Sequence, residues 1–213
     1  MAARDYGEYG GVTRALELVG ERWAMLIVRD LLVGPRRYGE LAAGLPRIPS
    51  NILAARLKEL QAAGVIRRAP RSRIVVYELT PFGRELEPVV LALGAWGFKA
   101  LRDRRDEQVV TPDSMTMDLR AAFRSNVAAT LPSTSYAAKV ESAELLIRVD
   151  GTSLDVSRGA GPADLVFSAG HGIHRLISGE LAPDRAVASG EIQVVSGPKN
   201  LLDRFSSTFH LAA

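Results

Sequence analysis

The sequence predicts an α+β protein of two domains, for three reasons. The 213 residues suffice for two domains of about 100–150 residues each. Apolar residues follow a helical spacing through most of the first half, whereas the second half mixes strand-like runs with helices. Charge also divides: residues 1–105 carry 18 Lys and Arg against 11 Asp and Glu, and residues 106–213 carry 9 against 13. We therefore expect a basic domain at 1–105, the half suited to a polyanion, and an acidic domain at 106–213.

Composition excludes several classes of protein. The chain has no cysteine, which excludes disulfides, thiolate metal sites and thiol redox sensing. No apolar run approaches the roughly 18–20 residues of a membrane span, so we expect no membrane partner. The first residues lack the apolar core of a signal peptide, and we expect a cytoplasmic protein.

The first half reads as three helices before a hairpin. Apolar residues at 3-4 spacing predict one amphipathic helix over 12–32, which Gly34 and Pro35 end. A short helix fits 38–43. A third helix begins at Ser50 and ends near Gly64, and its inward-facing residues are Leu53, Leu57 and Leu60.

A hairpin and a further helix follow. Strands are expected at 65–68 and 74–79, joined by a basic turn at 69–73. Thr80 and Pro81 then open another helix. This order of elements is that of a winged helix-turn-helix: helix, short helix, helix, two-stranded wing and helix. The alternative is a generic small α+β domain whose arginines only keep it soluble.

Four stretches in this half resemble a known family: ALELVGERW at 15–23, LLVGPRRYGEL at 31–41, IPSNILAARLKEL at 48–60 and YELTPFG at 77–83. They look like the HxlR-type branch of bacterial winged-helix regulators, over about residues 6–101. The resemblance implies dimers on pseudo-palindromic operators, often repressors or autoregulators and sometimes activators. Many members carry a cysteine before the first long helix. Here that region reads Tyr9-Gly10-Gly11-Val12, so any signal must arrive without a thiol.

The helix that begins at Ser50 should enter the major groove, where base edges can be distinguished. Asn51 could pair with adenine, and Arg56 with guanine or phosphate; phosphate or solvent is the alternative to base contact for each. Arg67 and Arg68 point to opposite faces of a strand, so only one should face DNA. The predicted DNA-binding residues are Arg36, Arg37, Ser50, Asn51, Arg56, Lys58, Arg68, Arg71 and Arg73.

The outer helices should form a homodimer. The helix after the wing presents more apolar surface than a small domain buries alone, and aromatic residues precede the first helix. A two-fold dimer would place half-sites about 10 or 20 base pairs apart. The expected interface residues are Tyr6, Tyr9, Val89, Val90, Leu93 and Trp96.

The second half predicts one sheet with helices against it, after a linker near 103–113. Strands are expected at 142–149 and 152–157, joined by Asp150-Gly151, and at 164–167 and 191–196; helices are expected at 171–178 and 198–209. The runs ADLVF at 163–167, LISGEL at 176–181, ASGEI at 188–192 and GPKNL at 197–201 are similar to the sterol carrier protein type 2 fold, over about residues 113–211. That resemblance implies either a sensor pocket for an apolar small molecule or a dimerisation module without a ligand.

Side chains of this half could line such a pocket, and an ordinary filled core is the alternative. His171 and His174 lie three apart, but no third metal ligand is evident, so we expect no metal. The candidate ligand-binding residues are Phe123, Tyr136, Phe167, His171, Ile173, Leu176, Ile177, Phe205 and Phe209.

Motifs of enzymes are missing from the sequence. It has no G-x-S-x-G elbow, no Walker loop and no dinucleotide-binding glycine motif in a suitable context. We therefore expect no catalytic activity and no cofactor. The prediction is a sequence-specific transcriptional regulator whose DNA affinity an apolar molecule modulates. A carrier of hydrophobic ligands is an alternative, and the modest net charge of +3 disfavours a purely architectural DNA-binding protein.

Overall fold

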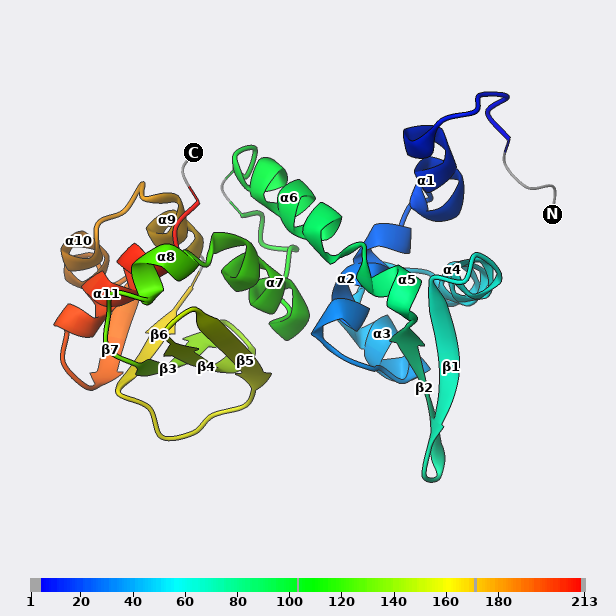
Figure 1. The fold of residues 1–213 in the computed structure, drawn as a ribbon. Helices are drawn as coiled ribbons and strands as arrows, with labels where there is room; N and C mark the ends of the chain where they lie inside the picture. Colours follow the sequence, from blue (N-terminus) through cyan, green and yellow to red (C-terminus); the bar gives the residue numbers. More distant parts are fainter. Residues whose placement is uncertain (1–4, 103, 171, 212–213) are drawn as a thin grey trace. The chain divides into compact units, whose positions relative to one another are not determined.

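The computed structural model describes residues 5–102, 104–170 and 172–211, which form two compact units, Met1–Val90 and Leu91–Ala213 (Figure 1). The division falls within helix α6 (Glu87–Phe98), earlier than the boundary at residue 105 suggested by the sequence. The end of α6 belongs to the second unit because Phe98 and Val110 pack into that unit's core. Among the described residues, no helix has the length and apolar character to cross a bilayer.

The first unit has the element order of a winged helix-turn-helix. Four helices come first: α1 (Gly11–Val19), α2 (Ala24–Val33), α3 (Tyr38–Gly44) and α4 (Ser50–Ala62). The antiparallel strands β1 (Ile66–Arg71) and β2 (Ile74–Leu79) form the wing, and α5 (Pro81–Arg84) and the start of α6 follow. The short helix expected over 38–43 and the helix expected from Ser50 to near Gly64 are confirmed as α3 and α4.

The single helix expected over 12–32 is wrong, because the chain breaks between α1 and α2. Gly20 ends α1: its N–H donates to the Leu16 carbonyl at 2.8 Å, and a Cβ at this position would lie 2.4 Å from that oxygen. Trp23 then adopts a left-handed conformation with φ 81°. The 3-4 spacing of apolar residues continues across the break, so periodicity could not reveal it.

The wing is longer than expected and its turn is shorter. β1 extends to Arg71, so the turn consists of Ser72, with φ 55°, and Arg73. Arg71 is therefore a strand residue rather than part of a five-residue tip. Figure 1 shows the hairpin projecting beyond the helices of its unit. At the other side of the wing, Arg36 pairs with Tyr77 of β2 through two backbone hydrogen bonds of 3.0 and 2.7 Å.

The helix expected after the wing is present but divided. The Thr80 hydroxyl accepts a hydrogen bond from the Gly83 N–H at 3.0 Å and so caps α5, as expected. Helix α5 ends at Arg84, and α6 begins at Glu87. Gly83 lies against the Val65 carbonyl, where a Cβ would come within 2.0 Å of the oxygen, and this close approach holds α5 beside the start of the wing.

The second unit is one five-stranded sheet with helices on one face (Figure 1). The strand order is β5-β4-β3-β6-β7; β3 and β6 are parallel, and the other pairs are antiparallel. The strands are β3 (Thr134–Val140), β4 (Ala143–Asp150), β5 (Ser153–Arg158), β6 (Leu165–Ala169) and β7 (Ile192–Ser196). The helices are α7 (Pro112–Ala122), α8 (Ser125–Ala128), α9 (Gly172–Ser178), α10 (Pro183–Ala188) and α11 (Asn200–Thr208).

The predicted sheet with helices and the hairpin at Asp150-Gly151 are confirmed. Strand β3 and helices α7, α8 and α10 were not predicted, although β3 is the middle strand of the sheet. In β4, residues alternate between buried and more exposed positions, as expected for a sheet that packs one face against helices. The core residues of the unit therefore lie between this face and the helices.

Candidate nucleic-acid interface

Helix α4 buries one face and exposes another. Leu53, Leu57 and Leu60 are at most 1% exposed, as the sequence predicted. Ser50, Asn51 and Lys58 are exposed. The Tyr38 hydroxyl of α3 donates to the Ser50 carbonyl at 2.9 Å, which fixes the start of α4 relative to α3. Ser50 and Asn51 are thus exposed in a first turn that the hydrogen bond from Tyr38 holds in place.

Arg56 is less exposed than the other predicted DNA-binding residues of α4. Its side chain is 13% exposed and forms an ion pair with Glu21 at 2.7 Å and another with Glu59. The pair with Glu21 ties α4 to the turn between α1 and α2, and the pair with Glu59 lies within α4. The Arg56 guanidinium is therefore engaged within the chain.

Two predicted cations stand at the start of α3. Arg37 is exposed, and its backbone N–H donates to the Glu40 carboxylate at 2.6 Å. Arg36 is half-buried, and its backbone pairing with Tyr77 places it beside the wing. These two cations therefore lie beside the wing and at the start of α3.

The wing arginines differ in their surroundings. Arg68 is exposed, and its guanidinium lies 6.0 Å from the centre of the Tyr77 ring. Arg73 is exposed at the turn. Arg71 pairs with Glu78 at 3.0 Å, and Arg67 pairs with the same carboxylate at 2.7 Å. Hydrogen bonds from Arg71 and Arg67 lower the pKa of the Glu78 carboxyl below its usual range.

Sequence reasoning missed two cations on this unit. Arg47 is exposed in the turn between α3 and α4. Its position just before α4 was the available signal. Arg67 was set aside in favour of Arg68 because strand neighbours face opposite ways. The pairing of Arg67 with Glu78 depends on the hairpin register, which places the two residues directly opposite each other.

Apolar side chains are exposed at both predicted dimer surfaces. Tyr6 and Tyr9 precede α1, and Val89, Leu93 and Trp96 form a stripe along α6. Trp96 is 72% exposed. Val90 departs from the expectation, because it is only 8% exposed and is already covered within the chain. The reason is helical spacing: positions 89, 93 and 96 share a face, and position 90 lies about 100° from it.

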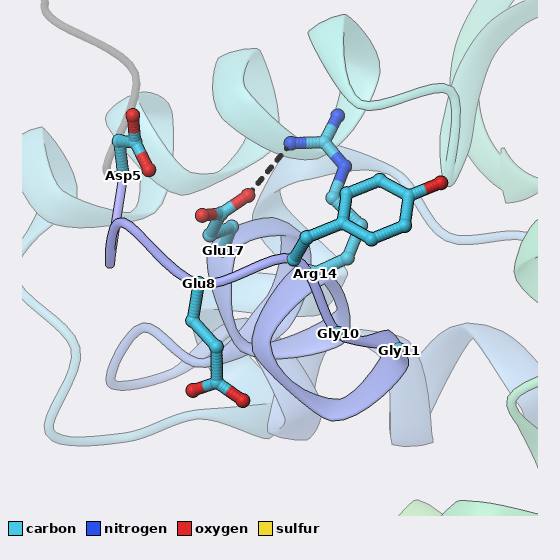
Figure 2. A pocket seen from close by; sticks show the side chains of 7 residues that line it. Asp5, Glu8, Gly10, Gly11, Arg14 and Glu17 are labelled. Carbon is cyan, nitrogen blue, oxygen red and sulfur yellow. Dashed lines mark hydrogen bonds and ion pairs between the residues drawn. The ribbon is translucent and has the colours of Figure 1, made fainter.

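A hollow of about 790 Å³ lies where the N-terminal segment meets α1 (Figure 2). The Tyr6 N–H donates to Glu17 at 3.3 Å, and Arg14 pairs with Glu17 at 2.9 Å. Three carboxylates line a hollow with a single cation, so its charge does not suit a phosphate. The lining residues are Asp5, Glu8, Tyr9, Gly10, Gly11, Arg14 and Glu17.

The candidate ligand-binding residues of the second unit lie in its core. Phe205 contacts three other rings, with centres 5.2 Å from Tyr136, 5.3 Å from Phe167 and 4.7 Å from Phe209. Ile173, Leu176 and Ile177 are fully buried in the same core, and Phe123 is partly buried against Phe209. The rings thus fill the space around Phe205 with one another.

Histidine placement gives no metal site in the part of the chain that the structure describes. His171 lies outside the described residues. His174 is 3.4 Å from Asp118, and its ring centre is 5.8 Å from that of Phe98. No group of three His, Cys, Asp or Glu side chains among the described residues could hold an ion.

Tyr136 brings a polar atom into this core. Its hydroxyl is buried and has no hydrogen-bond partner of ordinary geometry among the described residues. The hydroxyl of Thr134, close by, donates to the Pro132 carbonyl at 2.8 Å and accepts from Arg204 at 2.6 Å. Burial raises the pKa of Tyr136 to about 12, and the nearby charge of Arg204 opposes that shift.

Comparison with known proteins identifies the first half. The family described as HxlR-like helix-turn-helix matches residues 18–105. An uncharacterized HTH-type transcriptional regulator of Mycobacterium tuberculosis is 40% identical over 123 residues, which are 56% of this chain and 71% of the relative. One from Bacillus subtilis is 36% identical over 99 residues, 45% of this chain and 77% of the relative. The structure of the redox regulator HypR in its oxidized form is 33% identical, covers 45% of this chain and all of that one, and has a TM-score of 0.41.

Proposed function

The chain belongs to the HxlR-like helix-turn-helix family of transcriptional regulators, and we propose that it acts as a homodimeric repressor or autoregulator on a pseudo-palindromic operator. The observation that carries this proposal is the exposed first turn of α4, supported by the hydrogen bond from Tyr38. In this proposal Ser50 and Asn51 meet base edges in the major groove. Lys58, Arg36, Arg37, Arg47, Arg68 and Arg73 contact phosphates or the minor groove.

The proposed dimer uses the exposed stripe of α6 and the aromatic residues before α1. Val89, Leu93 and Trp96 expose apolar surface that water covers in a single chain. A second copy of the chain would remove this surface from water, and aromatic side chains are frequent anchors of interfaces. Two recognition helices related by a two-fold axis would then read two half-sites.

The experiment that tests DNA recognition is a gel-shift titration of the full chain. The probe is the DNA upstream of the chain's own gene, with a duplex of the same length and scrambled sequence as control. Autoregulation predicts binding at least roughly a thousandfold tighter to the natural probe, the low end of specific over non-specific affinity. Equal affinity for both probes would contradict autoregulation through this region.

Two roles suit the second unit, and different observations favour them. The contacts among Tyr136, Phe167, Phe205 and Phe209 favour a scaffold with a filled core. The unpartnered hydroxyl of Tyr136 favours a sterol-carrier-like sensor, because an apolar molecule with one polar atom would satisfy it. A sensor would bind differently in two dimer geometries and change operator affinity by about 5–150-fold.

Native mass spectrometry of the full chain, followed by DNA binding before and after organic extraction, separates these roles. A dimer that carries a small apolar passenger whose removal changes operator affinity supports the sensor. A passenger without any effect on DNA binding supports a carrier of hydrophobic ligands. A clean dimer with unchanged DNA binding supports the scaffold.

A further inference from the structure

The wing holds an acidic residue among four arginines. Glu78 lies on β2 directly opposite Arg67 of β1 in the hairpin register. Arg71, four residues further along β1, shares the face of Arg67 because side chains alternate along a strand. Glu78 therefore stands within reach of two of the cations that the wing would offer to DNA.

Both oxygens of the Glu78 carboxylate are engaged. Oε1 accepts from Arg67 Nε at 2.8 Å and lies 2.7 Å from Arg67 Nη2, and Oε2 accepts from Arg71 Nη2 at 3.0 Å. The Glu78 side chain is 7% exposed, whereas the two arginine side chains are 64% and 62% exposed. Charge-assisted hydrogen bonds of this geometry are among the stronger ones in proteins.

The other two wing arginines lack such a partner. Arg68 lies on the opposite face, over the Tyr77 ring, and Arg73 occupies the turn. In the described part of the chain, neither of them is paired with a carboxylate. The three groups Arg67, Arg71 and Glu78 together carry one positive charge, whereas Arg68 and Arg73 carry two.

We propose that Glu78 is a specificity-determining residue of DNA binding, because it occupies Arg67 and Arg71 with a carboxylate in the place of phosphate. This inference rests on the proposed DNA-binding function. Phosphate contacts raise affinity for every sequence, and base contacts distinguish sequences. A carboxylate that competes with phosphate keeps the sequence-independent part of the affinity low and leaves discrimination to α4. Building repulsion against unwanted partners is a general route to specificity.

The test uses Glu78→Gln, which removes the charge and keeps the shape of the side chain. Binding to a random-sequence duplex is measured by fluorescence anisotropy from 50 to 300 mM KCl. Each phosphate contact contributes about 0.9 to the slope of log affinity against log salt concentration. We expect the slope to steepen by about one or two units and the affinity at 100 mM to rise by roughly tenfold. Glu85→Gln is the matched control, since Glu85 is an exposed residue of the same unit and has no described ion pair.

Unchanged or weaker binding by Glu78→Gln, beside a wild-type chain that binds DNA, would overturn the role of Glu78 and leave the proposed function intact. A wild-type chain that binds no DNA would instead overturn the proposed function. If Glu78→Gln fails to fold, the single variants Arg73→Ala and Arg71→Ala, which retain Glu78, test the inference instead. We expect Arg73→Ala to lose about one unit of slope and Arg71→Ala clearly less. An equal or larger loss for Arg71→Ala would overturn the inference.

Discussion

The two units differ in what they leave exposed. The first unit exposes several large apolar side chains, among them Tyr6, Tyr9 and Val89, beside arginines on the wing and near the start of α3. The second unit begins at Leu91 and exposes Leu93, Trp96, Leu101 and Val109 before residue 110; past residue 110, Val195 is the one large apolar side chain exposed among the described residues. The first unit and the α6 stripe that crosses the boundary therefore have surfaces that suit partners, whereas the sheet and helices past residue 110 bury their apolar side chains in a core of their own. Stability experiments should report on the sheet and helices past residue 110, and binding experiments on the first unit and α6.

The largest expected effect concerns the ring cluster of the second unit. Phe205→Ala removes a fully buried ring that contacts three others, and such a change costs about 3–5 kcal/mol of unfolding free energy. Urea denaturation followed by circular dichroism measures it. Phe82→Ala is the control in the first unit, because Phe82 is half exposed and its loss should cost far less. Equal losses for both variants would break the comparison between the two units.

The next effect concerns the α6 stripe. Trp96→Glu places a charge on the exposed apolar surface, and we expect the dimer to dissociate at least about 30-fold more readily, since a Trp anchor contributes about 2 kcal/mol or more. Sedimentation equilibrium measures the dissociation constant. Val195→Glu introduces the same charge on an exposed side chain of β7, away from the α6 stripe, and should leave dimerisation unchanged. A dimer that tolerates Trp96→Glu would place the interface elsewhere.

The third effect concerns base recognition. Asn51→Ala removes an exposed amide from the first turn of α4, and a lost bidentate base contact weakens operator binding by about 1–3 kcal/mol. Anisotropy titrations on an operator and on a scrambled duplex measure the difference, which we expect to appear only on the operator. Asn126→Ala changes an exposed amide of the second unit and serves as control. A parallel loss on both duplexes would mean that Asn51 contacts phosphate.

Some features of the fold and of the candidate site could be predicted from the sequence. The buried leucine face of α4 and its exposed start follow from local spacing and were predicted. The break between α1 and α2 was not, because apolar spacing continues through Gly20 and Trp23. Strand β3 escaped prediction because its run Ala137-Ala138-Lys139 lacks strong strand formers, and its place is fixed by neighbours on both sides.

Tertiary contacts explain the remaining differences at the candidate site. The ion pair between Arg56 and Glu21 joins residues far apart in the sequence, so no local pattern indicates that Arg56 is largely buried. In the wing, too, the sequence does not indicate which residues pair, although here the partners lie closer together along the chain. Arg71 reads as a turn residue in the sequence, and only the register of β1 and β2 assigns it to a strand and to Glu78.

The smallest effect concerns Tyr136. Because burial raises its pKa to about 12 from the ordinary value of 10, the folded state holds the proton more tightly than the unfolded state. The associated stability is fully present below pH 10 and is lost as pH rises toward 12. We expect Tyr136→Phe to flatten this loss and, at neutral pH, to change stability by at most about 1 kcal/mol. Urea titrations from pH 8 to 12 measure it, with Tyr9→Phe as the exposed control.

The measurement that tests the central claim most directly is selection of bound sequences from a random duplex library by the full chain. The account predicts enrichment of a pseudo-palindrome whose half-sites are centred about 10 or 20 base pairs apart, the spacing that a two-fold dimer imposes on two recognition helices. Enrichment that disappears with Asn51→Ala would assign the recognition to α4. A library that emerges without any enriched sequence would contradict the account.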